Sequence, residues 1–167
     1  CSVRKWSPGC GNYKMSYDFS ITGPDRVISG IGALSQLPEA LARLGVTRPL
    51  LITGRTLATK TDLVARVEET LGASHAGTFS DCVQHVPESS VGKAYDIALD
   101  TDADVLVVFG GGSPIDTAKL VVKKLVDAGR AAVPQVAIPT TLSAGEFTHA
   151  AGVTNEETRV KHVQVDA

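Results

Sequence analysis

The sequence predicts an α/β fold, an open and parallel sheet with helices on both faces, and three observations lead to it. Strand-sized apolar runs alternate along the chain with segments of helical periodicity. These runs are apolar at consecutive positions, which is typical of parallel strands that are covered on both faces. The most apolar of them leads directly into a glycine-rich turn and a helix. With 167 residues, of which 43% are hydrophobic, the chain can bury the core of one ordinary domain.

Four strands and four helices follow from these patterns. The expected strands are residues 49–53, 77–80, 105–109 and 133–138, of which 77–80 is the weakest. Leucine and valine at helical spacing predict helices over residues 33–44, 61–71, 89–99 and 114–128.

Shorter elements are expected at the two ends of the chain. Residues 17–21 and 26–29 are predicted to form a hairpin around Gly23-Pro24, and residues 151–154 and 160–165 a strand pair after a loop. Residues 1–14 lack an apolar segment and an initiator Met. We therefore expect a disordered or non-native segment there and one domain over residues 15–167.

The composition excludes several classes of function. A net charge of −2 provides no basic field for nucleic acid. No run approaches the ~18 apolar residues that a membrane span needs. The three cysteines, Cys1, Cys10 and Cys82, show no motif spacing, which favours reduced thiols in a cytoplasmic protein. No two of the four histidines are spaced i, i+4, so no metal site is expected within the chain.

The strongest local feature is the Gly-Gly-Gly-Ser turn at residues 110–113, which follows the most apolar strand and opens a helix. Glycines let a ligand approach the backbone closely. Ser113 is expected as the N-cap, Pro114 as the first helical residue and Asp116 as the partner in a capping box. The unpaired N–H groups of such a helix start attract a phosphate. The alternative is a well-capped turn that binds nothing.

A second polar segment, with Thr140, Thr141 and Ser143, follows the last strand of the sheet. In an open α/β sheet, ligands bind beyond the carboxyl ends of the strands. A hydroxyl-rich loop in that place is expected to contact a phosphate, a ribose or a nicotinamide amide. The alternative is that these are turn residues that satisfy their own backbone.

Together the two segments resemble the iron-dependent (group III) alcohol dehydrogenase family, which includes maleylacetate reductase-like and glycerol dehydrogenase-like enzymes. The family pattern Gly-Gly-Gly-Ser-x-x-Asp-x-Ala-Lys, followed by Pro-Thr-Thr, matches residues 110–119 and 139–141 at the family's spacing. Further matches are residues 30–34, 85–87 and 152–154, and Lys161. The resemblance covers about residues 19–161, which is most of the chain.

The resemblance implies a Rossmann-like N-terminal domain followed by an all-helical domain. In the family, Fe²⁺ or sometimes Zn²⁺ is held by one Asp and several His, mostly in the helical domain, which we expect to be absent from this chain. No catalytic or metal-ligating residue is therefore assigned, and His149 and His162 are expected at the surface. The expected partners are the missing helical domain and a small-molecule alcohol or carbonyl substrate, and a homodimer is among the expected assemblies.

The resemblance also implies where NAD or NADP would bind. Gly111, Gly112 and Ser113 would hold the pyrophosphate, and Thr140 and Ser143 would line the adenine or nicotinamide side. Val153 and Lys161 would lie beside the cofactor, with Lys161 near the ribose or, alternatively, in solvent. Asp116 is expected to cap the helix, because a carboxylate gains nothing beside a pyrophosphate. The full candidate set is Gly54, Arg55, Gly110, Gly111, Gly112, Ser113, Asp116, Thr140, Thr141, Ser143, Val153 and Lys161.

The choice between NAD and NADP depends on the end of the strand at residues 49–53. An acidic residue there commonly binds the adenosine 2′-hydroxyl, and Gly54 stands where many family members carry Asp. Arg55, Thr56 and Lys60 could attract a 2′-phosphate. We predict that NADP(H) is accepted and, in the stronger form of the prediction, preferred; equal affinity for NADH and NADPH would contradict it. The alternative is that Arg55 simply points to solvent.

In the family, the metal polarises the alcohol or carbonyl oxygen, and a hydride passes between the substrate carbon and C4 of the nicotinamide. This chain would supply cofactor binding and one wall of the cleft, and no turnover is expected from it alone. Two alternatives stay open. One is a non-catalytic nucleotide-binding module or inactive fragment. The other is a lyase related to dehydroquinate synthase, which residues 139–148 fit less well.

Overall fold

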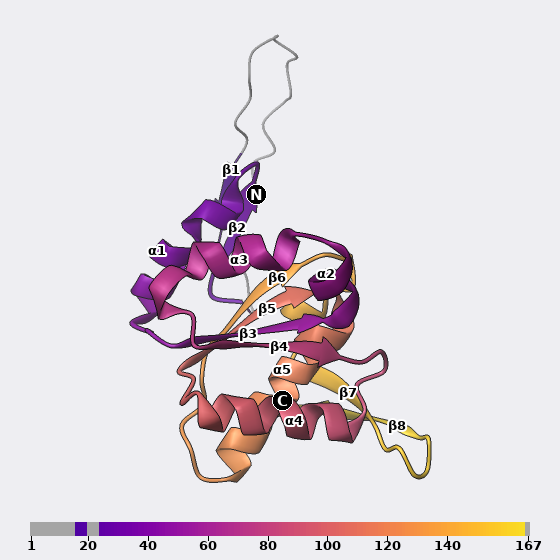
Figure 1. The fold of residues 1–167 in the computed structure, drawn as a ribbon. Helices are drawn as coiled ribbons and strands as arrows, with labels where there is room; N and C mark the ends of the chain where they lie inside the picture. The colour runs from indigo at the N-terminus through magenta and orange to yellow at the C-terminus, as the bar shows by residue number, and fades with distance from the viewer. Residues whose placement is uncertain (1–15, 20–23, 166–167) are drawn as a thin grey trace.

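Four parallel strands form the central sheet of the chain (Figure 1). The computed structural model describes residues 16–19 and 24–165. The strands lie in the order β4-β3-β5-β6, and each pairing between neighbours is parallel. Their bounds are Pro49–Gly54 for β3, Gly77–Cys82 for β4, Val105–Gly110 for β5 and Gln135–Pro139 for β6. The four carboxyl ends therefore meet at one edge of the sheet.

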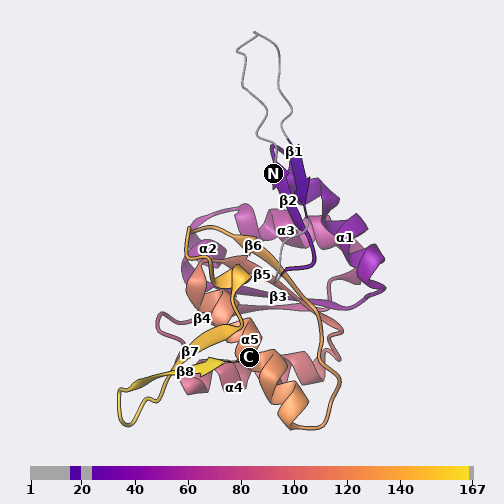
Figure 2. The same cartoon turned by 180° about the vertical axis from the view of Figure 1, so that it is seen from behind.

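Helices cover both faces of this sheet, which confirms the predicted fold class (Figures 1 and 2). On one face lie α1 (Leu37–Leu44) and α3 (Leu63–Leu71), and on the other lie α4 (Glu88–Asp100) and α5 (Gly112–Asp127). The shorter elements are the 3₁₀ turns η1 (Ala33–Gln36), η2 (Gly72–Ser74) and η3 (Gly145–Phe147) and the helix α2 (Arg55–Lys60).

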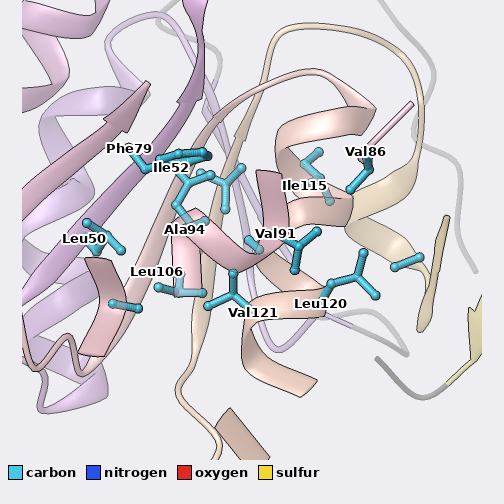
Figure 3. Close-up of a cluster of buried hydrophobic side chains, with 14 of the residues drawn as sticks. Leu50, Ile52, Phe79, Val86, Val91, Ala94, Leu106, Ile115, Leu120 and Val121 are labelled. Carbon is cyan, nitrogen blue, oxygen red and sulfur yellow. The ribbon is translucent and has the colours of Figure 1, made fainter. Parts of the chain in front are cut away.

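The two central strands, β3 and β5, are buried along their length except at Gly54. Successive side chains of a strand point to opposite faces, so each strand contributes to two cores. The larger cluster lies between the sheet and helices α4 and α5, and the strands contribute Leu50, Ile52, Leu106 and Val108 to it. Figure 3 shows part of this cluster, with Leu50, Ile52 and Leu106 among the labelled side chains. Leu51, Val105, Val107 and Phe109 pack with α1 and α3. This double coverage is why both strands carry apolar residues at consecutive positions, with Thr53 as the buried polar exception, and each large buried apolar side chain contributes about 2 kcal/mol.

Two antiparallel pairs accompany the sheet, as the sequence predicts. β1 (Ser16–Phe19) pairs with β2 (Val27–Gly30), and β7 (Ala150–Thr154) pairs with β8 (Lys161–Val165). The turn expected at Gly23-Pro24 begins in a segment that lies outside the described residues, as does the expected N-terminal segment 1–14. Among the described residues, no helix combines the length and the apolar character that crossing a membrane requires.

The predicted helices 61–71, 89–99 and 114–128 correspond to α3, α4 and α5 with ends that differ by one or two residues, and two larger differences remain. The predicted helix 33–44 is divided into η1 and α1, because Pro38 stands at the start of α1, where its missing N–H costs nothing. The helix α2, which precedes α3, was not predicted at all. Its six residues are too few to show an apolar period, and tertiary contacts rather than propensity hold such a short helix.

The amino ends of β3 and β5 are joined by the carboxylate of Asp104. It accepts hydrogen bonds from the backbone N–H of Thr47 and of Arg48, both at 2.7 Å, and from the Thr47 hydroxyl at 3.1 Å. Partial burial acts to raise the pKa of Asp104, but these hydrogen bonds outweigh it and hold the pKa below its ordinary value of 3.8.

We predict that Asp104→Ala destabilises the chain by about 1–2 kcal/mol at pH 7, since two backbone donors lose their acceptor. Because the folded-state pKa is lowered, the stabilisation is fully present above pH 3.8 and is lost as the pH falls through the folded-state value. Urea denaturation at several pH values should show that the unfolding free energies of the natural chain and of Asp104→Ala converge below the folded-state pKa of Asp104. Asp96→Ala, at an exposed position of α4, is the control. A difference that does not depend on pH would contradict this account.

Candidate functional site

The glycine turn lies where β5 ends and α5 begins, and the structure gives a reason for each glycine. A Cβ on Gly110 would come within 2.7 Å of Pro114 Cγ, and one on Gly111 within 3.0 Å of the Thr141 side chain. Gly112 has more room, since a Cβ there would meet Ser143 Cβ at an ordinary 3.5 Å. Close packing therefore requires glycine at position 110, whether or not a ligand binds, and at position 111 a side chain would have to displace that of Thr141.

Helix α5 begins without a side-chain cap. Gly111 is the N-cap and Gly112 the first helical residue, so the predicted roles of Ser113 as N-cap and Pro114 as first residue are wrong by two positions. Gly111 has no side chain of its own to cap the helix start. The N–H groups of Gly112 and Ser113 belong to the first turn, which has no acceptor within the helix. A helix start of this kind favours an anion.

Asp116 does not form the predicted capping box. Its Oδ2 instead accepts a hydrogen bond from the backbone N–H of Gly152 at 3.1 Å, which joins the start of α5 to β7. A residue three positions after an expected cap can face outward from the helix and find a partner elsewhere, and here that partner lies on β7.

The hydroxyl-rich loop lies directly against the glycine turn. The backbone N–H of Thr140 donates to the Gly110 carbonyl at 2.9 Å, and Thr141 and Ser143 face Gly111 and Gly112. The three hydroxyl residues are exposed. The structure therefore brings both sequence motifs together at the carboxyl edge of the sheet, where the side chains of Thr141 and Ser143 lie beside the helix start and Thr140 is joined to it through its backbone.

Lys119 of α5 holds the far end of this loop through hydrogen bonds, a role that the sequence analysis missed. Its side chain is buried, and its Nζ donates to the carbonyls of Gly145 and Ala150 at 2.7 and 2.8 Å and to the Thr148 hydroxyl at 3.0 Å. Burial lowers the pKa of Lys119, while the neighbouring charges of Asp116 and Glu146 act to raise it. The sequence did contain an indication of this burial, because Lys119 lies at helical spacing from the apolar residues Ile115 and Val122 and so falls on the same helix face.

At the end of β3, Gly54 and Arg55 lie beside a second residue that the sequence analysis missed. Arg55 Nε and Nη2 donate to Asp81 Oδ1 of β4 at 3.0 and 2.5 Å. Arg55 does not simply point to solvent, although its side chain is 73% exposed. A Cβ on Gly54 would meet only the Cys82 carbonyl, at 3.8 Å, so a larger residue would fit there.

Lys161 and Val153, on the strand pair, differ in their surroundings. Lys161 is exposed at the start of β8, and its alkyl chain crosses Gly152, the residue that Asp116 binds. Val153 is 5% exposed and belongs to the larger core cluster. It also lines a hollow of about 310 Å³ with α4 and α5 residues rather than the glycine turn. Its contact with a cofactor stays a prediction from the resemblance.

Other reactive side chains provide no further site in the part of the chain that the structure describes. Burial raises the pKa of the Cys82 thiol to about 12, so the thiolate nucleophile is scarce at neutral pH. His149 and His162 are exposed. Within residues 16–19 and 24–165, no three His, Cys, Asp or Glu side chains gather into a group that could hold a metal ion.

Comparison with known proteins gives a consistent result. The iron-containing alcohol dehydrogenase family matches the chain over residues 24–167. Maleylacetate reductase 2 of Cupriavidus pinatubonensis (strain JMP 134 / LMG 1197) is 39% identical over 131 residues, which make up 78% of this chain and 34% of that protein. The chain spans about a third of the length of the curated relatives that it matches.

Solved structures of larger proteins share the fold. Maleylacetate reductase from Rhizobium sp. strain MTP-10005 has a TM-score of 0.74 at 28% identity, over 90% of this chain and 40% of that one. Sulfoacetaldehyde reductase from Bifidobacterium kashiwanohense, in complex with NAD⁺, has a TM-score of 0.71 over 80% of this chain and 39% of that one. At 19% identity, this second likeness shows the fold alone.

We predict that Lys119→Met loosens the loop beside the glycine turn. The substitution removes the ammonium donor from two carbonyls and a hydroxyl and leaves the carbonyls with longer hydrogen bonds, among them those from the Thr148 hydroxyl at 3.2 and 3.3 Å. We expect a cost of about 1–3 kcal/mol in urea denaturation. Hydrogen–deuterium exchange should rise at residues 145–150. Lys123→Met is the matched control on the same helix, because it removes only an exposed i, i+4 pair with Asp127, worth about 0.5 kcal/mol. Equal effects of the two substitutions would show that Lys119 does not hold the loop.

Proposed function

Because the chain belongs to the iron-containing alcohol dehydrogenase family, we propose that it binds a nicotinamide dinucleotide, NAD(H) or NADP(H), at the glycine turn. One observation carries the proposal, the uncapped start of α5 at the carboxyl edge of the sheet. Backbone N–H groups there would receive the pyrophosphate, and the hydroxyl groups of Thr140, Thr141 and Ser143 stand beside it.

The space around Gly112 supports this placement. A Cβ at Gly112 would be in ordinary contact with Ser143 and with no closer atom, so nothing in the packing requires a glycine there. An open backbone is what a phosphate needs to approach the N–H groups closely. Glycine at this position is thus better explained by a ligand than by the fold.

We further propose that the dinucleotide serves hydride transfer between a small alcohol and an aldehyde or ketone, with the nicotinamide supplying the hydride chemistry. The support is the family and its reductase relatives. The described residues assign no ligand to the iron or zinc ion that the family implies. The function proposed for this chain itself therefore stops at holding the dinucleotide and forming one wall of the cleft.

A non-catalytic nucleotide-binding module is the second candidate. Leu142, next to the hydroxyl groups of the loop, is wholly exposed, and Phe147 is 40% exposed. Apolar side chains beside a ligand site favour a surface that is covered in the working protein, which supports the first candidate over a module that acts alone.

NADP(H) is the cofactor that the end of β3 favours in this proposal. Gly54 brings no carboxylate to repel a 2′-phosphate, and Arg55, Thr56 and Lys60 lie at or after that strand end. Their exposure leaves them accessible to a phosphate, although Arg55 already has a partner in Asp81.

We predict that Gly112→Val weakens binding of both NADH and NADPH by roughly tenfold or more, since the added side chain occupies the approach to the N–H groups. Titration of nicotinamide fluorescence measures both dissociation constants. Gly92→Val, at a helical glycine of α4 with open space around it, is the matched control and should bind as the natural chain does. Unchanged binding in Gly112→Val would contradict the proposed site, and no binding by the natural chain would contradict the function.

A further inference from the structure

Asp81 and Arg55 form an ion pair at the carboxyl edge of the sheet, beside the proposed dinucleotide site. We propose that Asp81 sets the selectivity between NADH and NADPH, because it competes with the adenosine 2′-phosphate for the Arg55 guanidinium. The proposal rests on the proposed function. It adds to the site a residue of β4, which is distant in the sequence from both the glycine turn and the hydroxyl-rich loop.

The register of the sheet places Arg55 at the strand end that neighbours the glycine turn, and Asp81 lies one strand farther away, on β4. Thr53 of β3 lies opposite Phe109 of β5, so Gly54 and Arg55 leave the sheet alongside Gly110 and Gly111. Figure 1 shows β3 and β5 side by side. The other neighbour of the turn is the loop after β6, which already packs on it through Thr141. A dinucleotide whose pyrophosphate lies at the start of α5 would extend its adenosine ribose toward the end of β3, and strand ends of this kind bind the 2′-position.

The two side chains favour different ligands at that position. A guanidinium binds phosphate through two parallel N–H donors, and in the structure Arg55 directs its Nε and Nη2 at one oxygen, Asp81 Oδ1. Asp81 Oδ1 thus occupies the place that a phosphate oxygen would take. The carboxylate repels a 2′-phosphate and can accept a hydrogen bond from a 2′-hydroxyl.

The exposure of the pair makes the competition reversible. The side chains are 73% and 39% exposed, and ion pairs in that setting contribute little to stability. NADPH can therefore displace Asp81 from Arg55 without unfolding the edge of the sheet. Asp81 weakens the preference for NADPH that Arg55 and the missing carboxylate at Gly54 would otherwise give.

The test is the ratio of the dissociation constants for NADH and NADPH, measured by nicotinamide fluorescence on the whole chain. In Asp81→Asn, NADPH should bind roughly tenfold more tightly, as expected when a charged hydrogen bond is gained, and NADH should bind no better than before. Arg55→Gln in the natural chain should weaken NADPH and spare NADH. The double variant should lose the gain that Asp81→Asn brings.

Asp102→Asn is the matched control. Asp102 also pairs with exposed arginines, Arg48 at 2.7 Å and Arg130 at 2.9 Å, but it lies at the amino edge of the sheet. The net charge changes equally, so a ratio that shifts as much in Asp102→Asn would reduce the effect to overall charge and overturn the proposal. An unchanged ratio in both Asp81→Asn and Arg55→Gln, with binding retained, would overturn it as well. Failure of the natural chain to bind either cofactor would instead reject the proposed function, and the selectivity with it.

Discussion

The parallel pairing of β3 with β5 is the constraint on which the rest of the structure depends. Both strands are covered on two faces, so their register is held by side chains that pack into two separate cores. A shift by one residue would exchange those cores and place each side chain on the wrong face. The same register brings Gly54-Arg55 level with Gly110-Gly111. The chemistry of the edge is thus a consequence of how the centre of the sheet is buried.

The site at that edge is held by contacts between segments that are far apart in the chain. The loop after β6 rests on the glycine turn, and Lys119 fixes the far end of the same loop through three acceptors. Asp116 joins β7 to the helix that opens the site. These polar contacts leave the first N–H groups of α5 without a side-chain cap. Packing supports the site from inside and leaves its outer surface to a ligand.

Much of this arrangement could be predicted from the sequence, because it is encoded locally. Consecutive apolar residues at 49–53 and 105–109 predict parallel strands that are covered on both faces. The glycine turn directly follows the second of them, and the loop at residues 139–148 follows the last strand, β6. What could not be predicted depends on partners distant in the chain. Asp116 has the spacing of a capping box but binds Gly152, 36 residues away. Arg55 meets Asp81 across 26 residues. The missed helix α2 is too short to carry a period of its own.

The function proposed for this chain depends on a nicotinamide dinucleotide binding at the start of α5. The most direct test is hydrogen–deuterium exchange of the natural chain with and without saturating NADPH, resolved to short peptides. The account predicts slower exchange at residues 110–115 and 140–145, and no change at the amino edge of the sheet around Thr47 and Asp104. Unchanged exchange at the glycine turn, or protection at the amino edge instead, would contradict it.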